Sequence, residues 1–336
     1  MAKLAEIISN NLNDGLSLAG SLLCLDALDH GDVSFLSSAA VATRKPKVRI
    51  ICTEQTHQLL GVMNKNIDAL VCQYNRPFSL GDLKLELLPS GALLGGASLF
   101  IETVHHGRVL YAPHLQTKHI PMVRKFQLKK AETLIIGAYS PSPNTQCPSR
   151  KKELQRLLAS LESSLAQNKS PKLVCMPFGT AQELSKIITD ADLPLELSPQ
   201  ILRINKIYEA HGSPLGQFQA FGRRSYSRTP QKTAVRLMSP EAWQRWVKKT
   251  GEGSEHTYYV DDVLNPVQTG IKLNTLVPTF HIGSTSIGAE TREVIAAVQP
   301  KQVYLFGPYA KTFAKELGEQ KYHARVLYDN AQPTLI

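Results

Sequence analysis

The stretch that decides the fold runs from Leu87 to Leu115 and reads L-L-P-S-G-A-L-L-G-G-A-S-L-F-I-E-T-V-H-H-G-R-V-L-Y-A-P-H-L. Just upstream, apolar residues at 83, 85 and 87 alternate with charged ones at 84 and 86, which predicts a strand with one buried face. A proline and several glycines at 89–96 indicate turns. His106-Gly107 predicts a hairpin turn between two strands. The segment is typical of the edge of a β-rich sandwich.

The composition is that of a globular protein large enough for two domains. The chain has 336 residues, of which 43% are hydrophobic and 20% charged. No apolar run approaches the roughly 18 residues of a membrane span, and no signal-peptide core is seen near the N-terminus. The five cysteines are scattered without a C-x-x-C pair, which favours reduced thiols, a cytoplasmic location and no cysteine-built zinc site.

The net charge is +10, which suits a polyanionic partner because cationic side chains release counterions when they contact phosphates. Solubility alone is the competing explanation, since net charge does not specify a binding site.

The residues at 89–111 resemble the corresponding part of metallo-β-lactamase-fold nucleases of the β-CASP group, such as bacterial DNA-ligase-associated exonucleases and RNA 3′-end-processing nucleases. In that family the segment reads Pro-x-Gly-His-x-x-Gly-Ser-Ala, then a hairpin, then Tyr-Ser-Gly-Asp. The frame survives in this chain as Pro89, Gly91, Gly95, Ala97, Gly107 and Tyr111.

Two further stretches resemble the β-CASP part of the same family. The apolar run 173–177 continues into Phe178-Gly179-Thr180-Ala181-Gln182-Glu183-Leu184, similar to the family's strand followed by Gly-x-x-Gln-Glu-Leu. A predicted helix after Ser198 carries Arg203, Asn205 and Tyr208 in an Arg-x-Asn-x-x-Tyr pattern. The resemblance covers about residues 16–328.

The resemblance implies an α/β fold, namely a four-layer αββα metallo-β-lactamase sandwich with an inserted α/β β-CASP domain. Its expected boundaries are 1–147 for the first part of the sandwich, 148–270 for the insertion and 271–336 for the return.

In the family, His and Asp residues bind two catalytic zinc ions, but the matching positions here hold almost no such residues. Imidazole and carboxylate groups hold zinc, whereas methyl groups cannot. Among these positions only His114 could coordinate a metal, so the resemblance implies a degenerate site with no catalytic residue and no zinc. The former metal positions are Ser38, Ala40, Ala42, Thr43, Ala92, His114, Ser284 and Phe306.

The expected function is therefore that of a catalytically inactive subunit that binds nucleic acid or a protein partner in DNA repair or RNA processing. Its partner would be DNA or RNA, or an active homologue, a helicase or a ligase, and no membrane is involved. Arginine and aromatic side chains interleave in the segment 221–236, where they could track phosphates and stack on bases. A solvated loop is the competing interpretation. The candidate nucleic-acid-binding residues are Arg223, Arg224, Arg228, Lys232 and Arg236.

Two other functions stay open at this point. One is an active metal-dependent nuclease or hydrolase with a displaced site near His105, His106, His114 and His119. The other is a scaffold subunit that does not contact nucleic acid.

Overall fold

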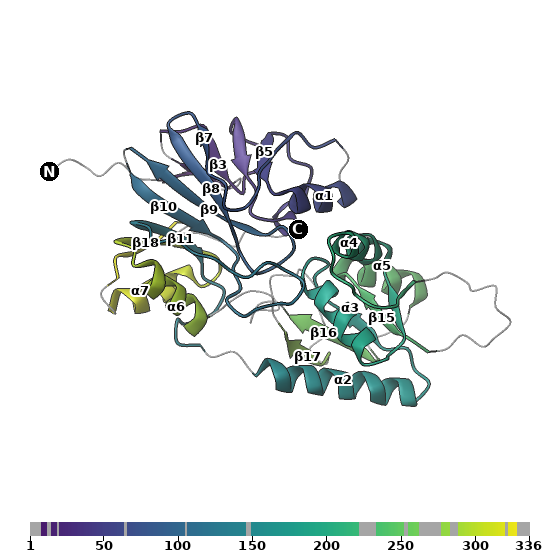
Figure 1. The fold of residues 1–336 in the computed structure, drawn as a ribbon. Helices are drawn as coiled ribbons and strands as arrows, with labels where there is room; N and C mark the ends of the chain where they lie inside the picture. The colour runs from purple at the N-terminus through teal and green to yellow at the C-terminus, as the bar shows by residue number, and fades with distance from the viewer. Residues whose placement is uncertain are drawn as a thin grey trace. The chain divides into compact units, whose positions relative to one another are not determined.

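The computed structural model divides the chain into two compact units (Figure 1). Unit 1 comprises residues 1–146 and 285–336, and unit 2 comprises residues 147–284. No helix among the described residues is both long and apolar enough to cross a membrane. The structure describes residues 8–11, 15–18, 20–63, 66–104, 106–145, 149–221, 233–251, 255–261, 277–282, 288–319 and 322–327.

Sheet A of unit 1 has six strands in the order β1-β2-β3-β4-β5-β6. The first three pair antiparallel, and β3 to β6 pair in parallel. A 3₁₀ turn, η1 (Ala39–Val41), follows β4, and helix α1 (Glu54–Met63) follows β5. The strands are β1 (Ile8–Asn11), β2 (Gly15–Leu18), β3 (Leu23–Leu25), β4 (Val33–Phe35), β5 (Arg49–Cys52) and β6 (Ala69–Val71).

Sheet B of unit 1 contains the strands expected from the sequence between 83 and 111, in the order β19-β18-β11-β10-β9-β8-β7. Thr103 pairs with Gly107 at the end of the β9–β10 hairpin, which confirms the predicted turn. Strands β10, β11 and β18 pair in parallel, so their carboxyl ends lie at one edge of the sheet. The strands are β7 (Phe78–Leu80), β8 (Leu83–Pro89), β9 (Ala97–Thr103), β10 (Gly107–Ala112), β11 (Thr133–Gly137), β18 (Gln302–Phe306) and β19 (Ala324–Val326).

The two sheets of unit 1 pack face to face, and helices cover the outer side of sheet B. Alternate residues of β8, Leu85 and Leu87, join a core cluster with Leu23, Leu25 and other residues of sheet A. The opposite face of sheet B packs against helices α6 (Ala289–Val298) and α7 (Ala310–Glu319). Unit 1 is thus a mixed α/β sandwich whose core forms from the side-chain alternation read in the sequence.

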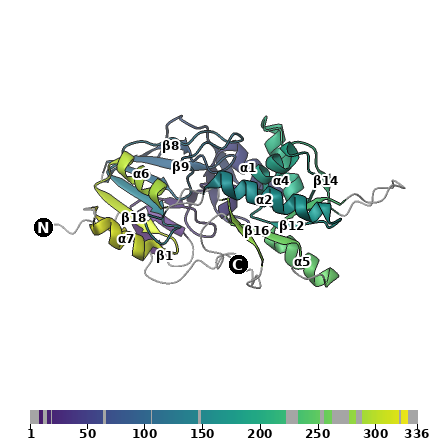
Figure 2. The ribbon, with the colours of Figure 1, turned by 90° about the horizontal axis from the view of Figure 1, so that it is seen from below.

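Unit 2 is built on a parallel sheet, sheet C, in the order β14-β13-β15-β12-β16-β17. Most of its core lies on one face, under three helices, while α5 (Pro240–Thr250) packs on the other face (Figure 2). The three helices are α2 (Arg150–Ala166), α3 (Thr180–Asp190) and α4 (Pro199–Ala210). The strands are β12 (Lys172–Val174), β13 (Leu195–Leu197), β14 (Gln219–Ala220), β15 (Val235–Met238), β16 (Thr257–Asp261) and β17 (Thr279–His281).

The two motifs of unit 2 singled out in the sequence contact each other in its interior. The amide of Gly179 donates to Gln182 Oε1 at 2.8 Å. The amide nitrogen of Gln182 donates to Pro177 O at 3.1 Å and to Asn205 Oδ1 at 2.9 Å. Gln182 and Asn205 are both fully buried, so this network satisfies polar groups that would be costly to bury unpaired. The motifs therefore have a structural role, joining α3 to α4.

The compact units differ in their limits from the domains expected at 148–270 and 271–336, because unit 2 begins one residue earlier and extends to residue 284. The return to unit 1 begins at Thr285. The reason is that β17 pairs in parallel with β16, from Tyr259↔Thr279 to Asp261↔His281, and so belongs to sheet C. A three-residue strand with a single apolar residue leaves too little pattern in the sequence to assign it to a sheet.

Candidate functional site at the strand ends of unit 1

A half-buried carboxylate, Asp26, links the two sheets of unit 1 at the carboxyl ends of their strands. Asp26 follows β3 directly and has a left-handed backbone, with φ of 53°. Its Oδ1 accepts the Ser37 amide at 2.7 Å, and its Oδ2 accepts the Ser37 hydroxyl at 2.8 Å. The Tyr111 hydroxyl, from β10 of sheet B, donates to the same Oδ2 at 2.7 Å. Three donors thus fix the carboxylate.

Burial and hydrogen bonding act in opposite directions on this carboxyl group. Burial raises the pKa of Asp26 from 3.8 to about 6, because it disfavours the charged form. The bonds from Ser37 and Tyr111 lower the pKa and so limit the rise. The carboxylate form of Asp26 is thus stabilised by these hydrogen bonds, and among the described residues no cationic side chain pairs with it.

Aromatic rings pack against Tyr111, which donates to this carboxylate. The Tyr111 ring lies between Phe35, in an edge-on contact at 6.2 Å between centroids, and Phe306, stacked at the same distance. His114 stacks on Tyr139 with centroids 4.9 Å apart, and its Nε2 lies 3.3 Å from the Tyr139 hydroxyl. We call this group the Asp26 cluster, which comprises Asp26, Ser37, Tyr111, His114, Tyr139 and Phe306.

The imidazole and the phenol of the cluster are both held neutral. Burial lowers the pKa of His114 from 6.5 to about 4. Burial, and secondly the charge of Asp26, raise the pKa of Tyr139 above its usual range. No group of the cluster combines a nucleophilic atom with a lowered pKa, so the cluster lacks the activated nucleophile that covalent catalysis uses.

Gly137 makes room for the Tyr139 ring. A Cβ on Gly137, the last residue of β11, would lie 2.3 Å from Cε2 of Tyr139 and 2.7 Å from the carbonyl oxygen of Pro113. A side chain at position 137 would therefore require a shift of the ring and of the backbone.

The glycine-rich turn that the resemblance implies as a metal-binding loop is held by other contacts. Gly95 has φ of 78°, and its carbonyl accepts the hydroxyls of Thr53 and Thr56, each at 2.8 Å. A Cβ on Gly95 would lie 2.5 Å from the Thr56 amide nitrogen. The close approach of α1 thus explains why position 95 is a glycine. Ala92, in the same turn, is 2% exposed and has only a methyl group as its side chain.

The other former metal positions lie at or near the strand ends, with different exposures. Ser38 is buried, and its hydroxyl has no hydrogen-bond partner among the described residues. Ala42 is buried, Ala40 is half-buried and Thr43 is exposed. Phe306 is half-buried against Tyr111, and Ser284 lies outside the described residues.

These side chains do not fit the pair of zinc ions that the family resemblance implies. Zinc takes thiolate, imidazole and carboxylate ligands. His114 alone of the former metal positions has such a group, and it stacks on Tyr139, while the oxygens of Asp26 already accept three hydrogen bonds. Across the described part of the chain, no three His, Cys, Asp or Glu side chains are grouped to hold a metal.

Two of the histidines proposed as a displaced site, His106 and His114, lie far apart. His106 precedes β10 at the hairpin end, and His114 follows the other end of that six-residue strand. At about 3.3 Å per residue, the strand separates them by roughly 20 Å. His119 is exposed, and His105 lies outside the described residues.

The structure describes one of the five candidate nucleic-acid-binding residues. Arg236 lies in β15, where its Nε is 3.3 Å from Glu196 Oε2 and its guanidinium lies 5.1 Å from the Phe221 ring centroid. Its charge is thus compensated within unit 2. Arg223, Arg224, Arg228 and Lys232 lie outside the described residues.

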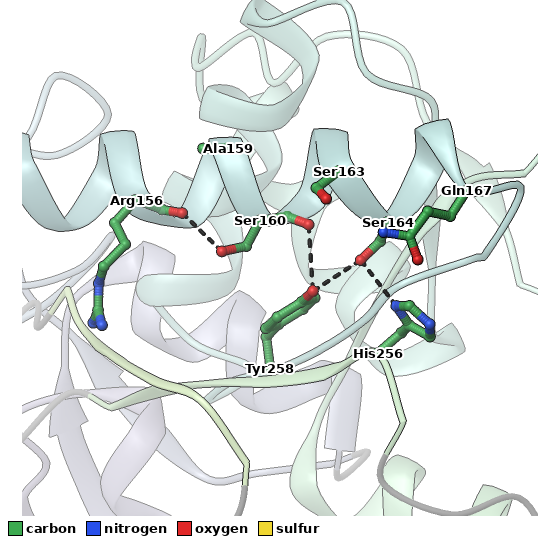
Figure 3. Close-up of a pocket in the computed structure, with 8 residues that line it drawn as sticks. All are labelled: Arg156, Ala159, Ser160, Ser163, Ser164, Gln167, His256 and Tyr258. Atoms are coloured by element: carbon green, nitrogen blue, oxygen red, sulfur yellow. Dashed lines mark hydrogen bonds between the residues drawn. The ribbon is translucent and has the colours of Figure 1, made fainter.

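A shallow pocket of about 400 Å³ lies in unit 2 between α2 and β16 (Figure 3). Its polar groups bond to one another: the Ser164 hydroxyl lies 2.8 Å from the Tyr258 hydroxyl and 3.1 Å from His256 Nδ1. Ser164 is 2% exposed, which leaves its oxygen inaccessible as a nucleophile. This serine–histidine contact is therefore structural.

Removal of the Tyr111 hydroxyl should destabilise unit 1 through Asp26. Tyr111→Phe takes one of three donors from an ionised carboxylate, which we expect to cost about 1.5–3 kcal/mol at neutral pH. Tyr304→Phe is the matched control, because Tyr304 belongs to the same core cluster but does not contact Asp26 through a hydrogen bond. Urea unfolding followed by circular dichroism measures both; equal losses would contradict the role of this bond.

The sequence analysis missed the partners that define the cluster. Only Tyr111 belongs to the frame at 89–111 that resembles the family, and no motif of the sequence singles out Asp26, Ser37 or Tyr139. The available signal was the placement of polar residues directly after buried strands, at Asp26 and Ser37. Tyr139 carries no such signal, because its role depends on the space left by Gly137 two residues earlier.

Comparisons with known proteins give partial matches. No protein-family model matches the chain. A probable DNA ligase of Opitutus terrae is 24% identical over 193 residues, which are 56% of this chain and 19% of the ligase. The uncharacterized protein sll0514 of Synechocystis is 31% identical over 119 residues, which are 32% of this chain and 21% of that protein. The chain thus spans about a fifth of the length of the curated relatives it matches.

Among solved structures, the chain is similar to a protein of unknown function from Enterococcus faecalis V583. The TM-score is 0.59 at 14% sequence identity, and the match covers 89% of this chain and 80% of the other. At this identity the likeness concerns the fold alone, and it extends over nearly the whole chain.

Proposed function

We propose that this protein is a catalytically inactive member of the metallo-β-lactamase-fold β-CASP group that binds single-stranded nucleic acid in DNA repair. The observation that carries the proposal is the Asp26 cluster. At the strand ends where the family resemblance implies two metal ions, this chain has a hydrogen-bonded carboxylate enclosed by Tyr111, Tyr139 and Phe306. Hydrolysis by two metals needs ligands on both ions, and these residue types do not supply them.

The fold assignment within this proposal is supported by the order of the elements. A face-to-face pair of sheets is interrupted by a parallel α/β unit at 147–284 and then completed by α6, β18, α7 and β19. The Gly179–Gln182–Asn205 network joins the two β-CASP-like motifs. Sandwich, insertion and motifs thus agree with the architecture that the resemblance implies.

Two observations support nucleic acid as the ligand. The net charge of +10 gives the protein an electrostatic attraction for phosphates. A relative that matches 56% of this chain is named a probable DNA ligase, which suggests a setting in DNA metabolism. The proposal therefore favours DNA over RNA.

The absence of cleavage is tested on the full chain. We expect no turnover of single-stranded DNA or RNA, with or without added Zn²⁺ or Mn²⁺, and no stoichiometric metal by elemental analysis. Turnover that is lost on chelation would overturn the proposal. The function would then be that of a metal-dependent nuclease.

Binding is tested by titrating a labelled oligothymidylate at several salt concentrations. We expect log affinity to fall linearly with log salt, by about 0.7 per phosphate contact for a single strand. No detectable affinity at low salt would reject nucleic-acid binding and favour the scaffold function, in which the protein contacts only a protein partner.

A further inference from the structure

Helix α5 of unit 2 is an exposed helix with an unusual composition. Its N-cap is Ser239, whose hydroxyl accepts the Ala242 amide at 3.3 Å, and its C-cap is Gly251 in the left-handed conformation. Of its eleven residues only Pro240 is buried. The core that it covers is correspondingly small, with Val174 and Tyr259 fully buried and Trp243 partly buried against them. A helix in this setting is held mainly by its ends and by one apolar stripe.

The solvent side of α5 is basic. Arg245, Lys248 and Lys249 are all exposed. At about 100° per residue they lie within an arc of roughly 100° of the helix surface. Arg245 donates from Nε to the carbonyl of Glu241 at 3.3 Å, and no ion pair is recorded for any of the three within the described residues. By contrast, Arg150, Lys186 and Arg236 of the same unit are each paired with a carboxylate.

Both tryptophans of the chain lie on this helix, beside the basic arc. Trp243 and Trp246 are the only two in the sequence, and each is half-buried. Trp246 is about 60° around the helix from Lys249. The ammonium of Lys172, a buried residue, lies over the Trp246 ring at 4.6 Å from its centroid, so one face of the ring already contacts a cation from within unit 2.

Helix stability explains only part of this arrangement. Lys248 and Lys249 are in the last turn, where cations interact favourably with the helix dipole. Arg245 lies one turn before these two lysines. Trp246 stays half-exposed next to three cations, so packing on the small core below the helix stabilises it little. Cationic groups that follow a phosphate backbone, combined with an aromatic ring that stacks on a base, are the general means of binding single strands.

We propose that the exposed face of α5, formed by Arg245, Lys248, Lys249 and Trp246, binds single-stranded DNA. The three cations would contact successive phosphates, and Trp246 would stack on an unpaired base. The inference rests on the proposed nucleic-acid-binding function and names its surface, which differs from the basic segment 221–236 expected from the sequence. Charge complementarity favours the polyanion, and the aromatic ring favours strands whose bases are not already stacked in a duplex.

Intrinsic fluorescence tests the position of the ligand directly, because the only two tryptophans are in α5. We expect an oligothymidylate to quench the tryptophan emission along the same curve that describes the anisotropy of the labelled strand. Binding by anisotropy with unchanged emission would place the DNA elsewhere and overturn this inference alone. No anisotropy change in the wild-type protein would instead reject the proposed function.

Charge reversal tests the cations. Lys248→Glu with Lys249→Glu should remove two phosphate contacts, reduce the salt slope by about 1.4 and weaken binding about twentyfold at roughly 0.1 M salt. The matched control is Lys151→Glu with Lys152→Glu, which makes the same charge change at two exposed lysines of α2. Equal losses of affinity in both variants would mean that only net charge matters, and this would reject the proposed surface.

Competition tests the class of ligand. A duplex or an RNA strand that competes better than oligothymidylate would overturn the ligand class.

Discussion

Gly137→Ala should lower the stability of unit 1 by about 2–4 kcal/mol, which is a large effect for a single methyl group. The new Cβ would lie 2.3 Å from Cε2 of Tyr139 and 2.7 Å from the Pro113 carbonyl oxygen. The ring could turn away at the cost of its contact with His114, but the carbonyl belongs to the backbone and cannot turn without moving the chain. Gly137 also pairs with Phe306, so any shift disturbs the centre of sheet B.

The matched control for this variant is Gly318→Ala in α7. A Cβ there has no heavy atom within 4 Å, and alanine is favoured over glycine in a helix by about 1 kcal/mol, so this variant should be slightly stabilised. Unfolding should be followed by circular dichroism, because both tryptophans belong to unit 2 and would not report on unit 1. Similar stabilities of Gly137→Ala and wild type would contradict a close-packed ring at the strand ends.

A double variant separates the two contacts of Gly137. In Gly137→Ala with Tyr139→Ala the ring is absent, so the loss should be smaller than the sum of the two single losses. If the losses of stability are strictly additive, the Pro113 carbonyl and not the Tyr139 ring is the reason why position 137 must be glycine.

Local patterns of the sequence predict much of the fold. The alternation at 83–87 gave β8, and the His106-Gly107 turn lies where β9 and β10 meet. The helix predicted after Ser198 is α4. These elements depend on side-chain period and turn chemistry, which a sequence displays directly. The boundary at Thr285 depends instead on which sheet a three-residue strand joins, and that pairing is a long-range property.

The candidate site was predictable in outline but not in detail. A sequence can reveal that Ala92 and Phe306 are not metal ligands. It cannot reveal that Tyr111 donates to Asp26 from 85 positions away, or that His114 stacks on Tyr139. Nor does it show that Arg236 is paired with Glu196 whereas Arg245 remains exposed, although both are arginines near aromatic residues. Such distinctions depend on packing between elements, which periodicity does not encode.

The two titrating groups of the Asp26 cluster should act on stability in opposite directions. Asp26 has its pKa raised from 3.8 to about 6, so its contribution is fully present below pH 3.8 and is lost as the pH rises through 6. His114 has its pKa lowered from 6.5 to about 4, so its contribution is present above pH 6.5 and is lost as the pH falls through 4. Each shift corresponds to roughly 3 kcal/mol, so between pH 4 and 6.5 the two nearly cancel in the wild type.

Replacing Asp26 or His114 by a neutral residue should reveal the two opposing changes of stability with pH. In Asp26→Asn, which tolerates the left-handed backbone, the His114 contribution remains and stability should rise by roughly 3 kcal/mol from pH 4 to 6.5. In His114→Gln the Asp26 contribution remains, and stability should fall by a similar amount over the same range. Unfolding by urea at several pH values measures both slopes, with the nearly flat wild type as the reference. Slopes of the same sign in the two variants would contradict a carboxylate held by hydroxyl and amide donors. A cation beside Asp26 would lower its pKa and so reverse its slope.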